Sequence, residues 1–171
     1  MIENQTSVNV ANIENPTKKI LARYKHAQSI KQQWTSVFEE CYEYALPQRE
    51  SFYSETIGRR RTDHIFDETA VVGIQEFASR LQSGIVPNYA RWANFVAGTE
   101  VPKQEQKEVN LALDEVTEYV FEILQNSNFS QEVHETFLDI AVGTGVLLVE
   151  EGDAVQPIRF KAIPLPQVCL K

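Results

Sequence analysis

The chain contains 171 residues, 43% of them hydrophobic and 23% charged, with only seven Gly and seven Pro, which excludes collagen-like, linker-like and globally disordered proteins. Sixteen Lys and Arg oppose twenty-four Asp and Glu, so the net charge is −8. Residues 62–171 carry seven basic and seventeen acidic groups, and this excess of negative charge disfavours tight, sequence-specific binding to DNA phosphates. A chain of this length is expected to form one hydrophobic core.

Cysteine content and apolar runs exclude further classes. Cys41 and Cys169 are the only cysteines and form no CxxC motif, so a disulfide scaffold or zinc ribbon is not expected. The longest uninterrupted apolar run, Val146-Leu147-Leu148-Val149, is far shorter than the roughly 20 residues of a membrane-spanning helix. The polar N-terminus also lacks the pattern of a secretory signal. We therefore expect no association with a membrane and a reducing cytosolic environment.

The N-terminal region predicts a flexible tail over residues 1–15, followed by one long helix. Asn15-Pro16 combines a helix-capping residue with a proline suited to the first helical position. Apolar residues then recur at helical spacings as far as Pro47: Ile20, Tyr24, Ala27, Trp34, Phe38, Cys41 and Ala45. A helix of this length spans about 45 Å, at roughly 1.5 Å per residue, and exceeds the width of a small domain. Its aromatic side chains are therefore candidates for core or subunit packing, namely Tyr24, Trp34, Phe38 and Tyr42.

The next stretch predicts an exposed loop and a second helix. Residues 48–66 are polar and show no apolar periodicity. Asp67 is a candidate cap for a helix that runs to Ile85, and Pro87 prevents its continuation. Its apolar stripe is formed by Ala70, Ile74, Phe77, Leu81 and Ile85.

A short extended segment and a third helix are predicted next. Arg91–Val96 contains Trp92, Phe95 and Val96 and reads as a strand-like segment. After Pro102, acidic residues surround an apolar stripe that we expect to face the core: Val109, Leu113, Val116, Val120 and Ile123.

The C-terminal part predicts a fourth helix and a β-hairpin. Asn128 and Gln131 resemble a capping box, and the apolar face that follows consists of Val133, Phe137, Ile140 and Ala141. Val146–Val149 and Ile158–Ile163 are strand-like, and Glu151-Gly152-Asp153 supplies turn residues between them. The sequence thus predicts a mainly α fold with a small antiparallel β element (α+β), in one mainly helical domain over residues 16–171.

Residues with metal-binding or catalytic potential are few. Asp63, His64, Asp67 and Glu68 form the tightest polar cluster, but a third fixed metal ligand is missing and a loop with a helix cap explains the same residues. Gly143-Thr144-Gly145 lies between a helix and a strand, which favours a helix end over a phosphate-binding loop. Neither cysteine has an evident His partner. We therefore predict no catalytic residue, no cofactor and no metal ion, and hence not an enzyme.

Arg59-Arg60-Arg61 is the one concentrated positive charge in the sequence. It is a candidate contact for a nucleic-acid backbone or for an acidic neighbouring subunit. A solvated loop explains the same run equally well.

Several stretches, taken in order, resemble the head-to-tail connector (portal) proteins of short-tailed, T7-like bacteriophages. The resemblance extends from about residue 17 to the end of the chain. It is carried by Tyr44-Ala45-Leu46-Pro47, Asp67-x-Thr69-Ala70, Ala78-Ser79-x-Leu81-x-Ser83-Gly84-Ile85-x-Pro87, Arg91-Trp92, Asn128-Phe129 and Ala141-Val142-Gly143-Thr144-Gly145-Val146-Leu147.

Connectors of this family are rings of twelve identical subunits at one capsid vertex, through which terminase packages double-stranded DNA that is later ejected. The resemblance therefore implies a structural virion component without an active site, assembled in the cytoplasm of a bacterial host. It implies a homo-oligomeric ring with terminase, capsid and tail proteins as partners, and double-stranded DNA passing without specific binding. It also implies that these residues form a wing-like N-terminal part of a longer chain.

Two other functions are consistent with the residues alone. One is a helical adaptor that binds a single partner without forming a ring. The other is a small metal-dependent hydrolase that uses His64, Asp67 and Glu68.

Overall fold

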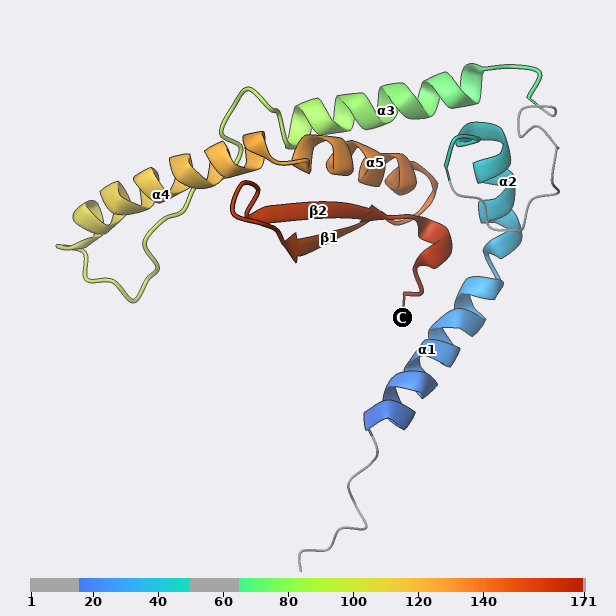
Figure 1. Ribbon diagram of the computed structural model, residues 1–171, viewed down its shortest axis with the longest axis horizontal. Coiled ribbons are helices and arrows are strands. Elements are labelled where there is room, and N and C mark those ends of the chain that lie inside the picture. The colour runs from blue at the N-terminus through green and yellow to red at the C-terminus, as the bar shows by residue number, and fades with distance from the viewer. Residues whose placement is uncertain (1–15, 50–64, 171) are drawn as a thin grey trace, which may run out of the picture. The chain divides into compact units, whose positions relative to one another are not determined.

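The computed structural model describes residues 16–49 and 65–170, which fall into two compact units (Figure 1). The first comprises the described residues up to Ser36 together with Cys169 and Leu170. The second extends from Val37 to Val168. The tail predicted over residues 1–15 lies outside the described residues, and the single domain predicted over residues 16–171 stays a prediction.

The expected single long N-terminal helix is wrong. Helix α1 (Pro16–Gln32) ends at a turn, and α2 (Thr35–Ala45) begins after it. The amides of the two residues between the helices donate to carbonyls three positions back, at 3.1 and 2.9 Å. The hydroxyl of Thr35 donates to the carbonyl of Lys31 at 3.1 Å. Hydroxyl side chains compete with the helical backbone ladder in this way, which the apolar spacing did not reveal.

The second unit confirms the mainly α fold with a small antiparallel sheet. Its further elements are α3 (Thr69–Ile85), α4 (Gln106–Asn126), α5 (Phe129–Val142), β1 (Val146–Glu151), β2 (Ile158–Ile163) and the short 3-10 helix η2 (Leu165–Gln167). Helix α5 lies between α3 and the hairpin (Figure 1). The core cluster draws on α2, α3, α5 and η2 and is formed by Tyr42, Leu46, Ala78, Val86, Val133, Phe137, Leu138 and Leu165.

The predicted hairpin is confirmed. Strands β1 and β2 pair antiparallel, with Val146 opposite Ile163 and Glu151 opposite Ile158. The turn between them is closed by the amide of Gly152, which donates to the carbonyl of Pro157 at 2.9 Å. The carboxylate of Asp153 accepts two backbone amides within the turn, at 2.9 and 2.8 Å, so the predicted turn residues hold its shape.

The predicted capping box at Asn128 and Gln131 is wrong, because Asn128 occupies the N-cap position of α5 but makes no side-chain capping hydrogen bond. The side chain of Asn128 exchanges two hydrogen bonds with the backbone of Phe160, at 2.7 and 3.0 Å. The carboxylate of Glu132 accepts the amide of Ala162 at 2.7 Å. The side chains of Asn128 and Glu132, at the start of α5, therefore hydrogen bond to the backbone along the edge of β2 that faces away from β1. Without them, this edge would be open to pairing with another strand.

The glycines after α5 end the helix, as predicted. Gly143 is the C-terminal cap of α5, and its amide donates to the carbonyl of Asp139 at 2.9 Å. Gly145 lies so close to α5 that a Cβ there would be 2.6 Å from the carbonyl oxygen of Thr136. The chain needs this close approach to enter β1 immediately after the helix.

The core face of α4 differs from the predicted stripe. Thr117 and Phe121 are its buried residues, whereas Val116, expected in the core, is 48% exposed. The hydroxyl of Thr117 donates to the carbonyl of Leu113 at 2.7 Å and accepts the amide of Phe95 at 3.2 Å, so its burial leaves no unpaired group. The other four residues of the predicted stripe are half-buried, so the covered face of α4 is shifted slightly toward Thr117 and Phe121.

Packing against α4 also explains why the strand expected over Arg91–Val96 is absent. The backbone of this segment bonds to side chains of α4 instead of to another strand: besides Phe95, the amide of Ala97 donates to Asn110 at 2.8 Å. The ring of Trp92 packs against two other aromatic rings. Its centroid lies 5.3 Å from that of Phe121 and 6.1 Å from that of Phe129. The segment thus covers one side of α4 and leaves the other side to solvent.

Candidate functional site

Of the residues in the hydrolase hypothesis, the structure describes Asp67 and Glu68. His64 and Asp63 lie outside the described residues, and Glu68 occupies the N-cap position of α3. Hydrogen bonds from the hydroxyl and the amide of Thr69 lower the pKa of Asp67. Among residues 16–49 and 65–170, no group of three or more His, Cys, Asp or Glu side chains could hold a metal ion.

The candidate contact residues fall in different environments. Arg59, Arg60 and Arg61 lie outside the described residues, so their contacts stay a prediction. Tyr42 belongs to the core cluster of its own chain, and Phe38 packs against that cluster. Tyr24 and Trp34 are 51% and 57% exposed, and subunit packing stays a prediction for these two.

A buried polar cluster connects α2, and the coil after it, with α5. The carboxylate of Asp139, which is 0% exposed, accepts hydrogen bonds from the hydroxyl of Tyr42 and from two nitrogens of Arg49, with Nε at 3.3 Å. The remaining terminal nitrogen of Arg49 pairs with Glu135, one turn earlier on α5. One guanidinium therefore joins this coil to two successive turns of α5.

The electrostatics of this cluster indicate a structural role. Burial raises the pKa of Tyr42 well above its ordinary value, and the hydrogen bond to Asp139 and its charge act in the same direction. Burial lowers the pKa of Arg49, but hydrogen bonding to Asp139 and the charges of Asp139 and Glu135 outweigh this effect and leave it raised. Within the described part of the chain, no buried polar side-chain atom lacks a partner. The buried groups of the cluster are thus all hydrogen-bonded, and the cluster joins α2 and the coil after it to α5.

Sequence reasoning missed this cluster. The signal was present in part, because Asp139 interrupts the otherwise apolar run from Phe137 to Val142. Its partners are 97 and 90 residues away in the sequence, so no local pattern links them.

His134 also serves to join helices. Its two ring nitrogens lie 3.1 Å from the side-chain oxygen of Gln82 and 3.4 Å from that of Gln75, both on α3. A hollow of about 280 Å³ adjoins His134 and the polar cluster. Both ring nitrogens have amide partners, which favours a role in α3–α5 packing.

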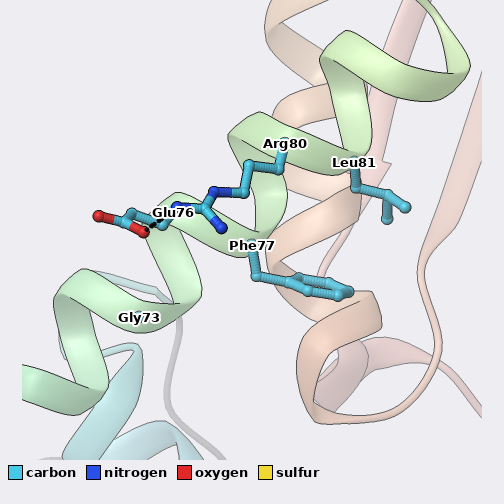
Figure 2. Close-up of a pocket in the computed structure, with 5 residues that line it drawn as sticks. All are labelled: Gly73, Glu76, Phe77, Arg80 and Leu81. Carbon is cyan, nitrogen blue, oxygen red and sulfur yellow. Dashed lines mark hydrogen bonds and ion pairs between the residues drawn. The ribbon is translucent and has the colours of Figure 1, made fainter.

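A shallow hollow of about 440 Å³ lies along α3 (Figure 2). Phe77 and Leu81 project from the same side of the helix, and Arg80 pairs with Glu76 at 3.0 Å beside them. Gly73 leaves open space at one end of the hollow. An apolar floor with a charged rim is suited to packing against another protein surface.

The outward face of α4 is acidic and partly apolar. Five acidic residues and one basic residue lie on this helix. Residues spaced by three and four positions form an exposed stripe: Glu108, Leu111, Glu115, Glu118, Tyr119 and Glu122. Arg91 lies near this face, with nitrogens 3.4 Å from Glu118 and 3.5 Å from Asp114. These side chains are exposed, so the ion pairs are weak and the acidic field remains.

Helix α1 has the opposite character. It contains five Lys or Arg residues and no acidic residue. Its larger apolar side chains are exposed as well, with Ile20 and Leu21 at 67% and 50%. The described surface thus offers three areas suited to protein contact, and all are built from helices.

The chain matches the family described as "Bacteriophage head to tail connecting protein" over residues 17–171. It is also 25% identical over 136 residues to a protein of Bordetella phage BPP-1 named "Probable portal protein". The alignment covers 77% of this chain but 24% of that relative, so the chain spans about a quarter of the relative's length.

No described helix is both long enough and apolar enough to cross a membrane. The geometry shows satisfied buried polar groups and exposed helical faces, and the family match extends over nearly all of the chain. The chain belongs to the family of bacteriophage head to tail connecting proteins.

Proposed function

We propose that the chain is part of a structural subunit of a phage portal, whose copies form a closed ring at one vertex of the capsid. The family match over residues 17–171 carries this proposal, and the name of the Bordetella phage relative supports it. Within such a subunit, we assign the chain to a wing-like N-terminal region of the type found in short-tailed, T7-like phages.

The exposed helices support self-association. A closed ring requires two different surfaces on each subunit, one of which contacts the next copy while the other contacts the previous one. Helices α1 and α4 and the hollow on α3 all expose large apolar side chains. Burial of such side chains against a sister copy would remove apolar area from water and so favour assembly.

The charge of the chain supports passage of DNA without adhesion. The net charge is −8, and the excess of acidic groups lies in residues 62–171. A surface of this sign repels phosphates and does not supply the counterion release that tight DNA binding needs. In this proposal, capsid and tail proteins and the terminase contact the assembled connector, which forms in the host cytoplasm and stays in the virion.

The proposal is tested on the complete protein that carries this sequence, by native mass spectrometry and negative-stain electron microscopy. We expect a ring-shaped particle with one defined subunit number and no dependence on metal ions. A protein that remains monomeric at every concentration contradicts the proposal. Stoichiometric binding of one partner by such a monomer would indicate the adaptor function instead.

A further inference from the structure

Helix α1 presents a basic face with an apolar residue at its centre. Lys18, Leu21 and Lys25 are separated by three and four residues, so they lie on one side of the helix. All three are exposed, and Leu21 retains 50% of its accessible surface. The two lysines are two helical turns apart, about 10 Å at roughly 1.5 Å per residue.

Helix α4 presents an acidic face with the same spacing in reverse order. Glu115, Tyr119 and Glu122 are separated by four and three residues and are exposed. Tyr119 retains 64% of its accessible surface. When an antiparallel helix is laid along this face, Lys18 comes opposite Glu122, and Lys25 comes opposite Glu115. Leu21 then lies opposite Tyr119.

From this correspondence we propose that α1 of one copy docks antiparallel on the outward face of α4 of the next copy. The inference rests on the proposed ring and names the contact that joins neighbouring subunits. The pairing buries one apolar contact between two opposite-charge contacts. The charge pairs set the register, and Leu21 lies directly opposite Tyr119 only in the antiparallel orientation.

Charge also selects a head-to-tail contact over a symmetric one. Two α1 helices would bring ten basic side chains together, since each has five and no acidic residue. Two α4 helices would bring their acidic faces together, and like charges across an interface are costly. The attractive combination is α1 with α4, and a chain that carries both can bind a neighbour at each side, as ring closure needs.

The test uses charge reversal on each helix of the complete protein. One variant carries Lys18→Glu and Lys25→Glu, a second carries Glu115→Lys and Glu122→Lys, and a third carries all four changes. The helix dipole favours Glu near an N-terminus and Lys near a C-terminus, so Lys18→Glu and Glu122→Lys suit their own helices. Far-UV circular dichroism checks that each variant is folded.

Assembly is measured by sedimentation velocity at equal protein concentration. Each two-residue variant is expected to weaken self-association by about tenfold or more, because two attractive pairs become repulsive. The four-residue variant is expected to assemble again. An equimolar mixture of the two weakened variants is also expected to assemble, because each reversed helix then meets an oppositely charged partner on the other variant.

Matched controls change the same net charge on exposed residues of other elements. Lys103→Glu with Lys161→Glu controls for the α1 variant, and Glu100→Lys with Glu151→Lys controls for the α4 variant; all four positions are exposed. These controls are expected to assemble like the unmodified protein. Equal weakening by the controls would overturn the inference, because net charge alone would then explain the effect.

The mixture separates contact between copies from contact within one chain. If the four-residue variant assembles but the mixture does not, α1 docks on α4 of its own chain and the inference is overturned. If neither two-residue variant weakens assembly, the inference is overturned while the proposed ring stands. If the unmodified protein does not self-associate, both the inference and the proposed ring fail.

A cysteine pair tests the register independently. In a chain whose Cys41 and Cys169 are replaced by Ser, Leu21→Cys with Tyr119→Cys is expected to form disulfide-linked oligomers on mild oxidation. Leu21→Cys with Leu111→Cys places the second thiol about two turns away along α4 and is expected to form few. Equal cross-linking by both pairs would overturn the antiparallel register.

Discussion

Helices α5 and α4 are neighbours in the chain but have opposite relations to solvent. Five residues of α5 are buried, including the carboxylate of Asp139, because α3 and the hairpin pack on it and the coil after α2 reaches it through Arg49. Two residues of α4 are buried, and the segment containing Trp92 covers only one of its sides. Helix α5 therefore holds the second unit together, whereas α4 leaves an acidic and partly apolar face exposed.

The largest expected effect is the loss of stability on removing a buried carboxylate, compared with the loss on removing an exposed one. Asp139→Ala leaves the positive charge of Arg49 partly buried without its main partner, and we expect a loss of about 3–5 kcal/mol in the free energy of unfolding. Glu118→Ala removes an exposed partner of Arg91 on α4 and is expected to cost less than about 1 kcal/mol. Urea denaturation measures both, and equal losses would contradict the contrast between the two helices.

A second comparison lies within α4 itself. Phe121 is 8% exposed and packs on Trp92, so Phe121→Ala is expected to cost about 3 kcal/mol of stability. Tyr119→Ala on the outward face is expected to change stability by less than about 0.5 kcal/mol when the protein is diluted to its dissociated state. Thermal and urea unfolding give the two values, and a large loss for Tyr119→Ala would show that the outward face packs within its own chain.

Two glycines are expected to respond with opposite sign. In Gly145→Ala, the new Cβ meets the Thr136 carbonyl at 2.6 Å, and we expect a loss of about 2 kcal/mol. Gly73 lies within α3 with open space around it, so Gly73→Ala is expected to stabilise by up to about 1 kcal/mol through helix propensity. Differential scanning calorimetry should show a lower Tm for the first variant and a higher Tm for the second.

The smallest expected loss at a buried position concerns the hydroxyl of Tyr42. Tyr42→Phe is expected to cost about 1.5 kcal/mol at neutral pH, because Asp139 loses a donor. Burial and Asp139 raise the pKa of Tyr42, so folding favours its neutral form. That contribution is complete below the ordinary tyrosine pKa of about 10 and falls as the pH rises above it. Alkaline unfolding curves of the variant should therefore decline less steeply above pH 10 than those of the unmodified protein.

The elements that sequence reasoning predicted well are those defined by short-range patterns. The bounds of β2 and the C-terminal end of α3 follow from apolar periodicity and turn residues, and they lie where expected; β1 begins at the expected residue but extends to Glu151, which was expected in the turn. These local patterns were misleading where a hydrogen-bond partner distant in the sequence determines the structure. Asn128 looks like the start of a capping box, yet its side chain bonds to Phe160, 32 residues later. Likewise, Arg91–Val96 has the composition of a strand, but α4 takes its backbone hydrogen bonds.

The candidate contact surfaces were visible to different degrees. The positive charge of α1 is evident from the sequence, because this helix contains basic residues and no acidic residue. Periodicity assigned the acidic residues of α4 to the exposed face correctly, but several faces of this helix carry apolar residues, and Val116 was placed in the core although it is exposed. Which of these faces is covered depends on the aromatic contact between Trp92 and Phe121.

The sequence alone determined the mainly α class, the hairpin, most helix limits and the family resemblance, because these depend on spacing and residue type over a few turns. Tertiary structure decided which residues of α4 are fully buried and which groups neutralise Asp139. These outcomes depend on side chains that are distant in the chain and meet only on folding. Their contact energies outweigh the local propensities that a sequence displays.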